Sequence, residues 1–123
     1  IIGKRSKVNS NETLKYEFVP SGGVEHLSND GIKKIIYKEI LEEIGLSNKD
    51  ILDIVPFGWC IDFKHMVVDL IYEISLQTQR KVNLSNEHII LEWTDIFDLT
   101  EKRDCLTLSS ASYLNLKVNS YDY

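Results

Sequence analysis

The sequence predicts a single α+β domain in which strands and two helices pack around an ordinary hydrophobic core. The chain has 123 residues, of which 43% are hydrophobic and 27% are charged, and this balance suits one compact domain. Segments rich in Ile, Val and aromatic residues are divided by polar turns, as strands are. Two other segments repeat apolar residues at helical spacing. The order of strands, helix, strands and helix favours an α+β sandwich.

Two short strands are expected to open the chain. Residues 1–4 and 16–19 are β-like, a polar loop at 6–13 separates them, and the Pro-Ser-Gly-Gly turn at 20–23 ends the second strand. Later elements follow from similar patterns. Further strands are predicted at 51–63, 66–76 and 88–93, a short helical turn at 94–99, and a closing helix at 106–118.

Between these strand segments, a helix is predicted from about residue 30 to Ile44. Polar residues at 28–30 can cap its start, and Gly45 ends it. On a wheel of about 100° per residue, one side of the helix is a broad apolar arc. This arc contains Ile32, Ile36, Ile40 and Ile44.

Three glutamates of this helix, Glu39, Glu42 and Glu43, lie at the margin of the apolar arc, whereas Lys34 and Lys38 lie on the opposite side. A plain interpretation is a solvated helix surface with lysine partners four residues away. However, carboxylates gathered toward the protein repel one another and lose hydration unless positive charge offsets both effects. Their spacing of three and four residues lets them converge, and carboxylates without nearby Cys or paired His favour Mg²⁺ or Mn²⁺ over zinc. The helix therefore predicts a divalent cation site.

Charge and composition exclude several classes of function. The formal net charge of −5 disfavours binding to the nucleic-acid backbone. Cys60 and Cys105 lack the spacing of a zinc site and are expected to be reduced thiols. No window approaches the roughly 18 apolar residues of a membrane helix, so a soluble cytoplasmic protein that does not bind membranes is expected.

The glutamate helix and the turn before it resemble the Nudix box. That pattern is Gly, five residues, Glu, seven residues, then Arg-Glu-apolar-any-Glu-Glu-any-Gly-apolar. Residues 38–46, Lys-Glu-Ile-Leu-Glu-Glu-Ile-Gly-Leu, match its second half except that Lys38 replaces the arginine. Gly22 and Gly23 resemble the family's turn, and Asp30 stands in place of the first glutamate. Seven residues rather than five separate Gly22 from Asp30, which corresponds to a two-residue insertion.

The resemblance covers nearly all of residues 1–123 and implies one Nudix-like domain, an α/β/α sandwich around a mixed β-sheet. In such a domain, residues 1–5 would be the tail of an early strand whose beginning lies outside the sequence. The cofactor implied is Mg²⁺, with Mn²⁺ as the alternative. Its ligands by resemblance are the carboxylates of Glu39, Glu42 and Glu43 and the backbone carbonyl of Ser21.

The reaction implied is metal-assisted attack of water on phosphorus in a nucleoside diphosphate linked to another moiety. Glu39 is one candidate for the carboxylate that deprotonates or orients the water, and Glu87, in the loop before the 88–93 strand, is another. The resemblance assigns Gly22, Gly23 and Lys38 to the substrate site. Arg5, at the end of the first strand, is a candidate for contact with the substrate phosphates.

Several alternatives stay open from the sequence alone. The substitutions at Lys38 and Asp30 favour a catalytically weak or inactive nucleotide-binding module of the same fold, because lysine orients carboxylates less rigidly than the planar fork of arginine. A homodimer, common in the family, is not decided by the sequence. The substrate derivative is also open, since specificity resides in loops outside the box, for which residues 77–87 are the candidate.

Overall fold

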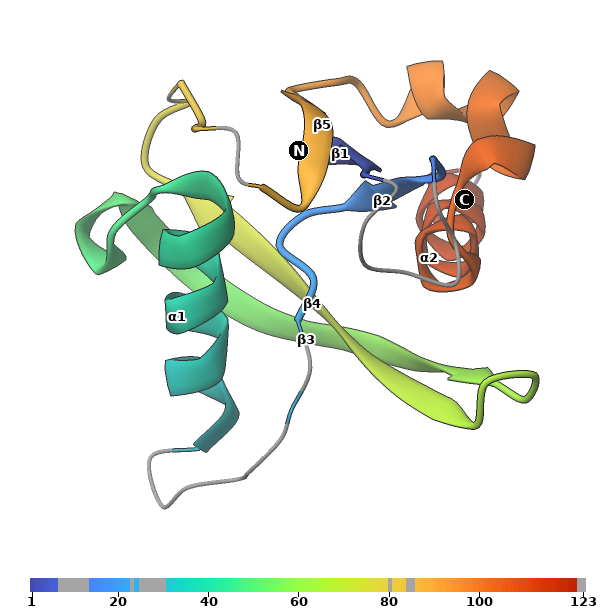
Figure 1. The fold of residues 1–123 in the computed structure, drawn as a ribbon, viewed down its shortest axis with the longest axis horizontal. Helices are drawn as coiled ribbons and strands as arrows, with labels where there is room; N and C mark the ends of the chain where they lie inside the picture. The colour runs from blue at the N-terminus through green and yellow to red at the C-terminus, as the bar shows by residue number, and fades with distance from the viewer. Residues whose placement is uncertain (7–13, 23, 25–30, 80, 84–85, 122–123) are drawn as a thin grey trace.

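The chain forms a three-stranded sheet and a long β-hairpin, with one helix beside each (Figure 1). A computed structural model describes residues 1–6, 14–22, 24, 31–79, 81–83 and 86–121. The elements are β1 (Ile2–Arg5), β2 (Tyr16–Phe18), α1 (Gly31–Ile44), the 3-10 turn η1 (Asn48–Asp50), β3 (Ile51–Asp62), β4 (Val67–Leu76), β5 (His88–Glu92), the 3-10 helix η2 (Phe97–Cys105) and α2 (Leu108–Asn119).

The three-stranded sheet has the order β2-β1-β5, and both pairings are antiparallel. Ile2, at the centre of the sheet, is 1% exposed. It packs in one buried cluster with Leu99 of η2, Leu114 of α2 and Leu106, which lies between these helices. Burial of these apolar side chains stabilises the packing of α2 against one face of the sheet.

The second sheet is the hairpin of β3 and β4, which crosses the middle of the molecule in Figure 1. Ile51 pairs with Leu76 at its base and Asp62 pairs with Val67 next to the turn. The register shifts between Pro56 and Gly58, where proline cannot donate a ladder hydrogen bond. A turn over residues 63–66 joins the two strands, and so short a connection makes the pair antiparallel.

Helix α1 packs its isoleucines onto the hairpin and the other face of the three-stranded sheet. Ile40 is fully buried and Ile44 is nearly so. They belong to a second cluster that includes Ile74 of β4 and Leu91 of β5. The helix ends at Gly45, whose φ of 72° is a left-handed conformation that glycine adopts without a steric penalty.

The predicted α+β class is confirmed, and α1 begins and ends within one residue of the prediction. The helical turn expected at 94–99 is instead the longer η2 helix, which begins at Phe97. The described strands do not form the single mixed sheet that the resemblance implies. They form two sheets whose strands are antiparallel, and the described residues pair in parallel only at one bridge between Tyr16 and Leu106. A short turn that reverses the chain accounts for the antiparallel pairing of β3 with β4, whereas β1 pairs with β5 from the far end of the chain.

Two further expectations concern membranes and thiols. Within the described residues, no helix has the length and apolar character needed to cross a membrane. Cys60 and Cys105 are both free thiols, as the sequence predicts.

Candidate functional site

The candidate site lies where the turn after β2 meets α1. The backbone N–H of Ser21 donates to both carboxylate oxygens of Glu43, at 3.2 Å each. Glu43 is only 4% exposed. The amide N–H of Ser21 therefore holds a buried carboxyl group against the turn, whereas the sequence analysis singles out only the carbonyl of this residue.

Glu39 lies one helical turn before Glu43 and is pressed against the same loop. A Cβ built on Gly22 would lie 2.3 Å from Cδ of Glu39 and 2.4 Å from its Oε2. Any side chain at position 22 would therefore occupy the space of this carboxylate. Gly22 is required here for close approach of the backbone to an acidic group.

The two carboxyl groups have raised pKa values. Burial is the largest cause for both, and it raises the pKa of Glu43 to about 8. The N–H of Ser21 opposes that rise, whereas the charges of Glu87, Glu17 and Glu39 add to it. The pKa of Glu39 is also above its ordinary value, because of burial and then the neighbouring charge of Glu42. Both carboxyl groups therefore hold their protons to a higher pH than an exposed glutamate does.

Glu42 and Lys38 lie on the exposed side of α1. Their ion pair spans 3.8 Å between Nζ and Oε2, with more than half of each side chain exposed. This is the helix pair that the plain interpretation of the sequence expects, and an exposed pair of this length stabilises little. The structure therefore brings Glu39 and Glu43 together at the turn and leaves Glu42 at the rim.

The remaining predicted residues lie on neighbouring strands or outside the described chain. Glu87 is exposed, and its carbonyl accepts a hydrogen bond of 2.8 Å from the N–H of Ser6. Arg5 pairs with His88 across the β1–β5 ladder. Gly23 and Asp30 lie outside the described residues.

Two residues that the sequence analysis does not single out, Glu17 and His88, are buried beside this site. Oε2 of Glu17 accepts from Nη1 of Arg5 at 3.1 Å, and Oε1 lies 2.8 Å from Nε2 of His88. Alternation along β2 places Glu17 on the face opposite Tyr16 and Phe18, which from the sequence alone is the expected solvent face. Neither residue was therefore detectable, since Glu17 and His88 are 71 residues apart and meet only when β1 pairs with β2 and β5.

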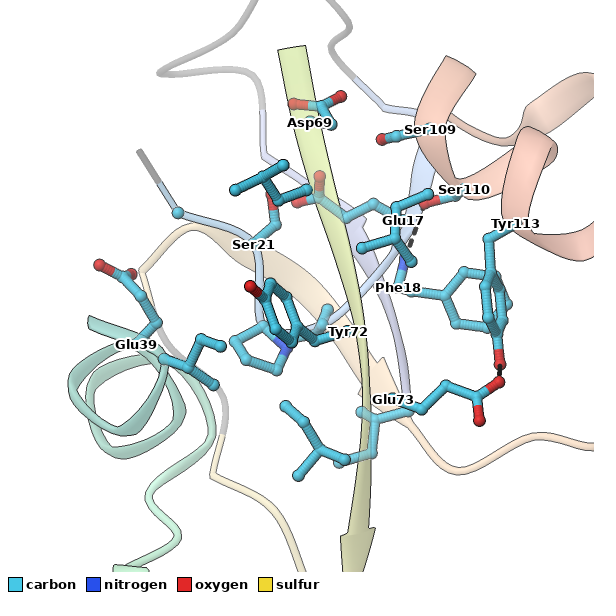
Figure 2. A pocket seen from close by; sticks show the side chains of 18 of the residues that line it. Glu17, Phe18, Ser21, Glu39, Asp69, Tyr72, Glu73, Ser109, Ser110 and Tyr113 are labelled. Atoms are coloured by element: carbon cyan, nitrogen blue, oxygen red, sulfur yellow. Dashed lines mark hydrogen bonds between the residues drawn. The ribbon is translucent and has the colours of Figure 1, made fainter. Parts of the chain in front are cut away.

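A cavity of about 780 Å³ connects these elements. Its wall includes Arg5, Glu17, Ser21, Gly22 and Glu39. Figure 2 shows Glu39 and Ser21 at one end of this cavity and Tyr113, bonded to Glu73, at the other. A volume of this size accommodates a small organic ligand.

The oxygen atoms at the turn are of the type that binds a hard cation. Within the described part of the chain, no group of three or more His, Cys, Asp or Glu side chains is already gathered as a complete metal site. Glu39 and Glu43 nevertheless place carboxyl oxygens at the same loop, beside Gly22 and the Ser21 amide, and oxygen is the ligand type that hard cations such as Mg²⁺ prefer. Glu42 is a rim carboxylate that can complete such a set.

Comparison with known proteins gives no independent assignment. The chain matches no protein-family model, and a search of curated proteins finds no similar sequence. A functional assignment therefore depends on the geometry of the turn, α1 and the cavity.

Proposed function

We propose that this protein is a Mg²⁺-dependent hydrolase of the Nudix type, which cleaves a phosphoanhydride in a nucleoside diphosphate linked to another moiety. One observation carries the proposal: the Ser21 amide holds the buried carboxyl group of Glu43, and Glu39, one helical turn earlier, is pressed on Gly22 and lines a cavity of about 780 Å³. The order of turn, helix and glutamates supports a Nudix-like arrangement of the fold.

The residues of the site would divide metal binding and proton transfer among them. Glu39, Glu43 and the rim residue Glu42 would hold the cation, with the Ser21 carbonyl as a further ligand. When bound, the cation neutralises charge on the phosphates and lowers the pKa of water. Glu39 lines the cavity and has a raised pKa, which suits a group that accepts a proton from the attacking water. Glu87 is the second candidate for this base.

In the reaction, the water oxygen forms a bond to phosphorus while the bond from phosphorus to the bridging oxygen breaks. The proton of the water passes to the carboxylate base, and the bridging oxygen leaves with one phosphate product. Arg5 lines the same cavity, and its guanidinium would bind phosphate oxygens, for which its planar fork of donors is suited. The proposed partner is thus a small nucleotide-like molecule rather than nucleic acid.

We expect that release of phosphate or nucleoside monophosphate from a panel of nucleoside diphosphate derivatives requires Mg²⁺ or Mn²⁺. Glu43→Gln keeps the size of the side chain and removes its charge, and should lower kcat/KM at least about hundredfold, as loss of a group that stabilises the transition state does. Product release is measured by coupled phosphate detection and chromatography. Glu101→Gln, the same change on an exposed residue of η2 outside the cavity, is the matched control and should leave kcat/KM unchanged.

A second candidate is a nucleotide-binding module without turnover. The observation that favours it is the outward position of Glu42, paired with Lys38 rather than with Glu39 and Glu43. Metal-dependent binding of a nucleotide with no product from any member of the panel would support the module and contradict the hydrolase.

A further inference from the structure

The three-stranded sheet carries a polar network on the face that looks toward α1. Cross-strand partners share a face, and Gly3 pairs with Glu17 on one side and with Leu91 on the other. Leu91 packs in the same cluster as Ile40 of α1. Glu17 therefore lies on the α1 side of the sheet, beneath the candidate site.

The network joins all three strands. Glu17 on β2 bonds Arg5 of β1 through one carboxylate oxygen and His88 of β5 through the other, at 3.1 and 2.8 Å. The side chains of Glu17 and His88 are 7% and 1% exposed, whereas that of Arg5 is 29% exposed. When Glu17 is ionised, Nε2 of His88 must carry the proton that it donates. Glu17 and His88 are thus the buried part of the network, and Arg5 is its partly exposed part.

Gly3 makes the network possible. A Cβ at this position would lie 2.5 Å from Cδ2 of His88 and 2.8 Å from a methyl group of Val19. The imidazole therefore passes directly over the backbone of the central strand to reach Glu17 on the far strand. With any larger residue at position 3, the ring could not stay in this place.

The network ends at the candidate site. Arg5, Glu17 and Glu39 line the same cavity. Glu17 engages one nitrogen of the guanidinium, and a guanidinium has five N–H donors, so this contact by itself does not occupy all of them. A long side chain ordered before binding loses less entropy when the ligand arrives.

We propose that Glu17 and His88 are a positioning pair, which holds the Arg5 guanidinium in the cavity so that it binds the phosphate oxygens of the substrate. This inference rests on the proposed function, because it explains what holds the phosphate-binding group proposed there. Glu17 and His88 act through Arg5 and do not touch the reacting atoms.

Gly3→Ala tests the proposal without changing any charged residue. Its Cβ displaces the His88 ring, so the KM for the diphosphate substrate should rise about tenfold while kcat changes less than about threefold. In an Arg5→Gln background, Gly3→Ala should have no further effect on KM, since the group that it misplaces is already absent. Gly58→Ala on β3 is the matched control, because a Cβ there meets nothing within 4 Å.

Substitutions of His88 test the same proposal independently, in case Gly3→Ala does not fold. His88→Gln can still donate a hydrogen bond to Glu17 and should keep a KM near the native value, whereas His88→Leu should reproduce the rise. Thermal melting of each variant checks that it is folded. Binding of inorganic pyrophosphate with Mg²⁺, measured by calorimetry, provides a readout that does not need turnover, and its Kd should rise about tenfold in Gly3→Ala and His88→Leu.

The outcomes separate the two proposals. Suppose that the native chain hydrolyses a substrate but the KM values of Gly3→Ala and His88→Leu equal that of Gly58→Ala. The positioning role is then wrong and the hydrolase stands. The same conclusion follows if Gly3→Ala raises KM as much in the Arg5→Gln background as in the native chain. If nothing is hydrolysed but pyrophosphate binding weakens as expected in Gly3→Ala and His88→Leu, the positioning role stands and the hydrolase is wrong. A chain that neither hydrolyses nor binds contradicts both.

Discussion

At the scale of single residues, Glu43 is predicted to make stability depend on pH. Burial raises its pKa from an ordinary 4.5 to about 8. Between these values the folded chain binds more protons at this carboxyl than the unfolded chain, so the free energy of unfolding falls as pH rises through the window. Glutamine cannot ionise. Glu43→Gln should therefore match the native protein near about pH 5 and exceed its stability above about pH 8, by at least about 1.4 kcal/mol, the equivalent of one pKa unit.

Urea denaturation of both proteins across this pH range is the measurement, without divalent cations. Repeating it with Mg²⁺ is a control on the cause, because a cation that binds the ionised carboxylate should stabilise the native protein more at about pH 8 than at about pH 5. Equal stability of the native and Glu43→Gln proteins at about pH 9 would show that the buried carboxyl is not destabilised by its charge.

At the scale of elements, the turn after β2 and α1 are joined by the contact between Gly22 and Glu39. Gly22→Ala places a methyl group on the Glu39 carboxylate, which is the mobile end of a flexible side chain and can turn away. We therefore expect little loss of thermal stability but Mg²⁺ binding at least about tenfold weaker, since displacing a ligand or its support costs this much. Calorimetric titration with Mg²⁺ and thermal melting measure the two effects.

Gly58→Ala again serves as the control for a glycine in open space. Unchanged Mg²⁺ affinity in Gly22→Ala would remove Glu39 from the metal site. A large fall in melting temperature would instead mean that the turn is needed for folding, and that Glu39 does not simply move aside.

How far the elements could be predicted depends on the range of the forces that fix them. The boundaries of α1 follow from its isoleucine spacing and from Gly45, which are local signals. Residues 51–62 and 67–76 were likewise recognisable as strands. The glutamate spacing predicted that Glu39 and Glu43 lie side by side, but not that Glu39 contacts Gly22. In contrast, η2 begins later and runs longer than predicted, because its largely polar sequence has no clear apolar period.

At the scale of the whole molecule, the division into two sheets was not predictable from the sequence. Periodicity identifies a strand but not the strand that it pairs with, and β1 pairs with β5, which lies more than 80 residues further along the chain. The same limit applies to Glu17 and His88, which meet only after β1 has paired on both sides. Long-range pairing therefore creates both the architecture and the part of the site that local patterns miss.

The three-stranded sheet is shared by the two buried clusters, and this sharing predicts that they unfold together. Ile40 lies in the cluster with α1 and Leu114 in the cluster with α2, and both are fully buried. Replacing either with alanine should cost about 2–5 kcal/mol, whereas Leu41→Ala and Leu116→Ala, at sites more than half exposed on the same helices, should cost far less. In urea, tryptophan fluorescence and far-UV circular dichroism should give one coincident transition for every variant, with a lower midpoint and an unchanged slope for the two core changes. If Leu114→Ala instead separated the two signals, each cluster would unfold by itself, and the sheet between them would not couple the site at α1 to the packing of α2.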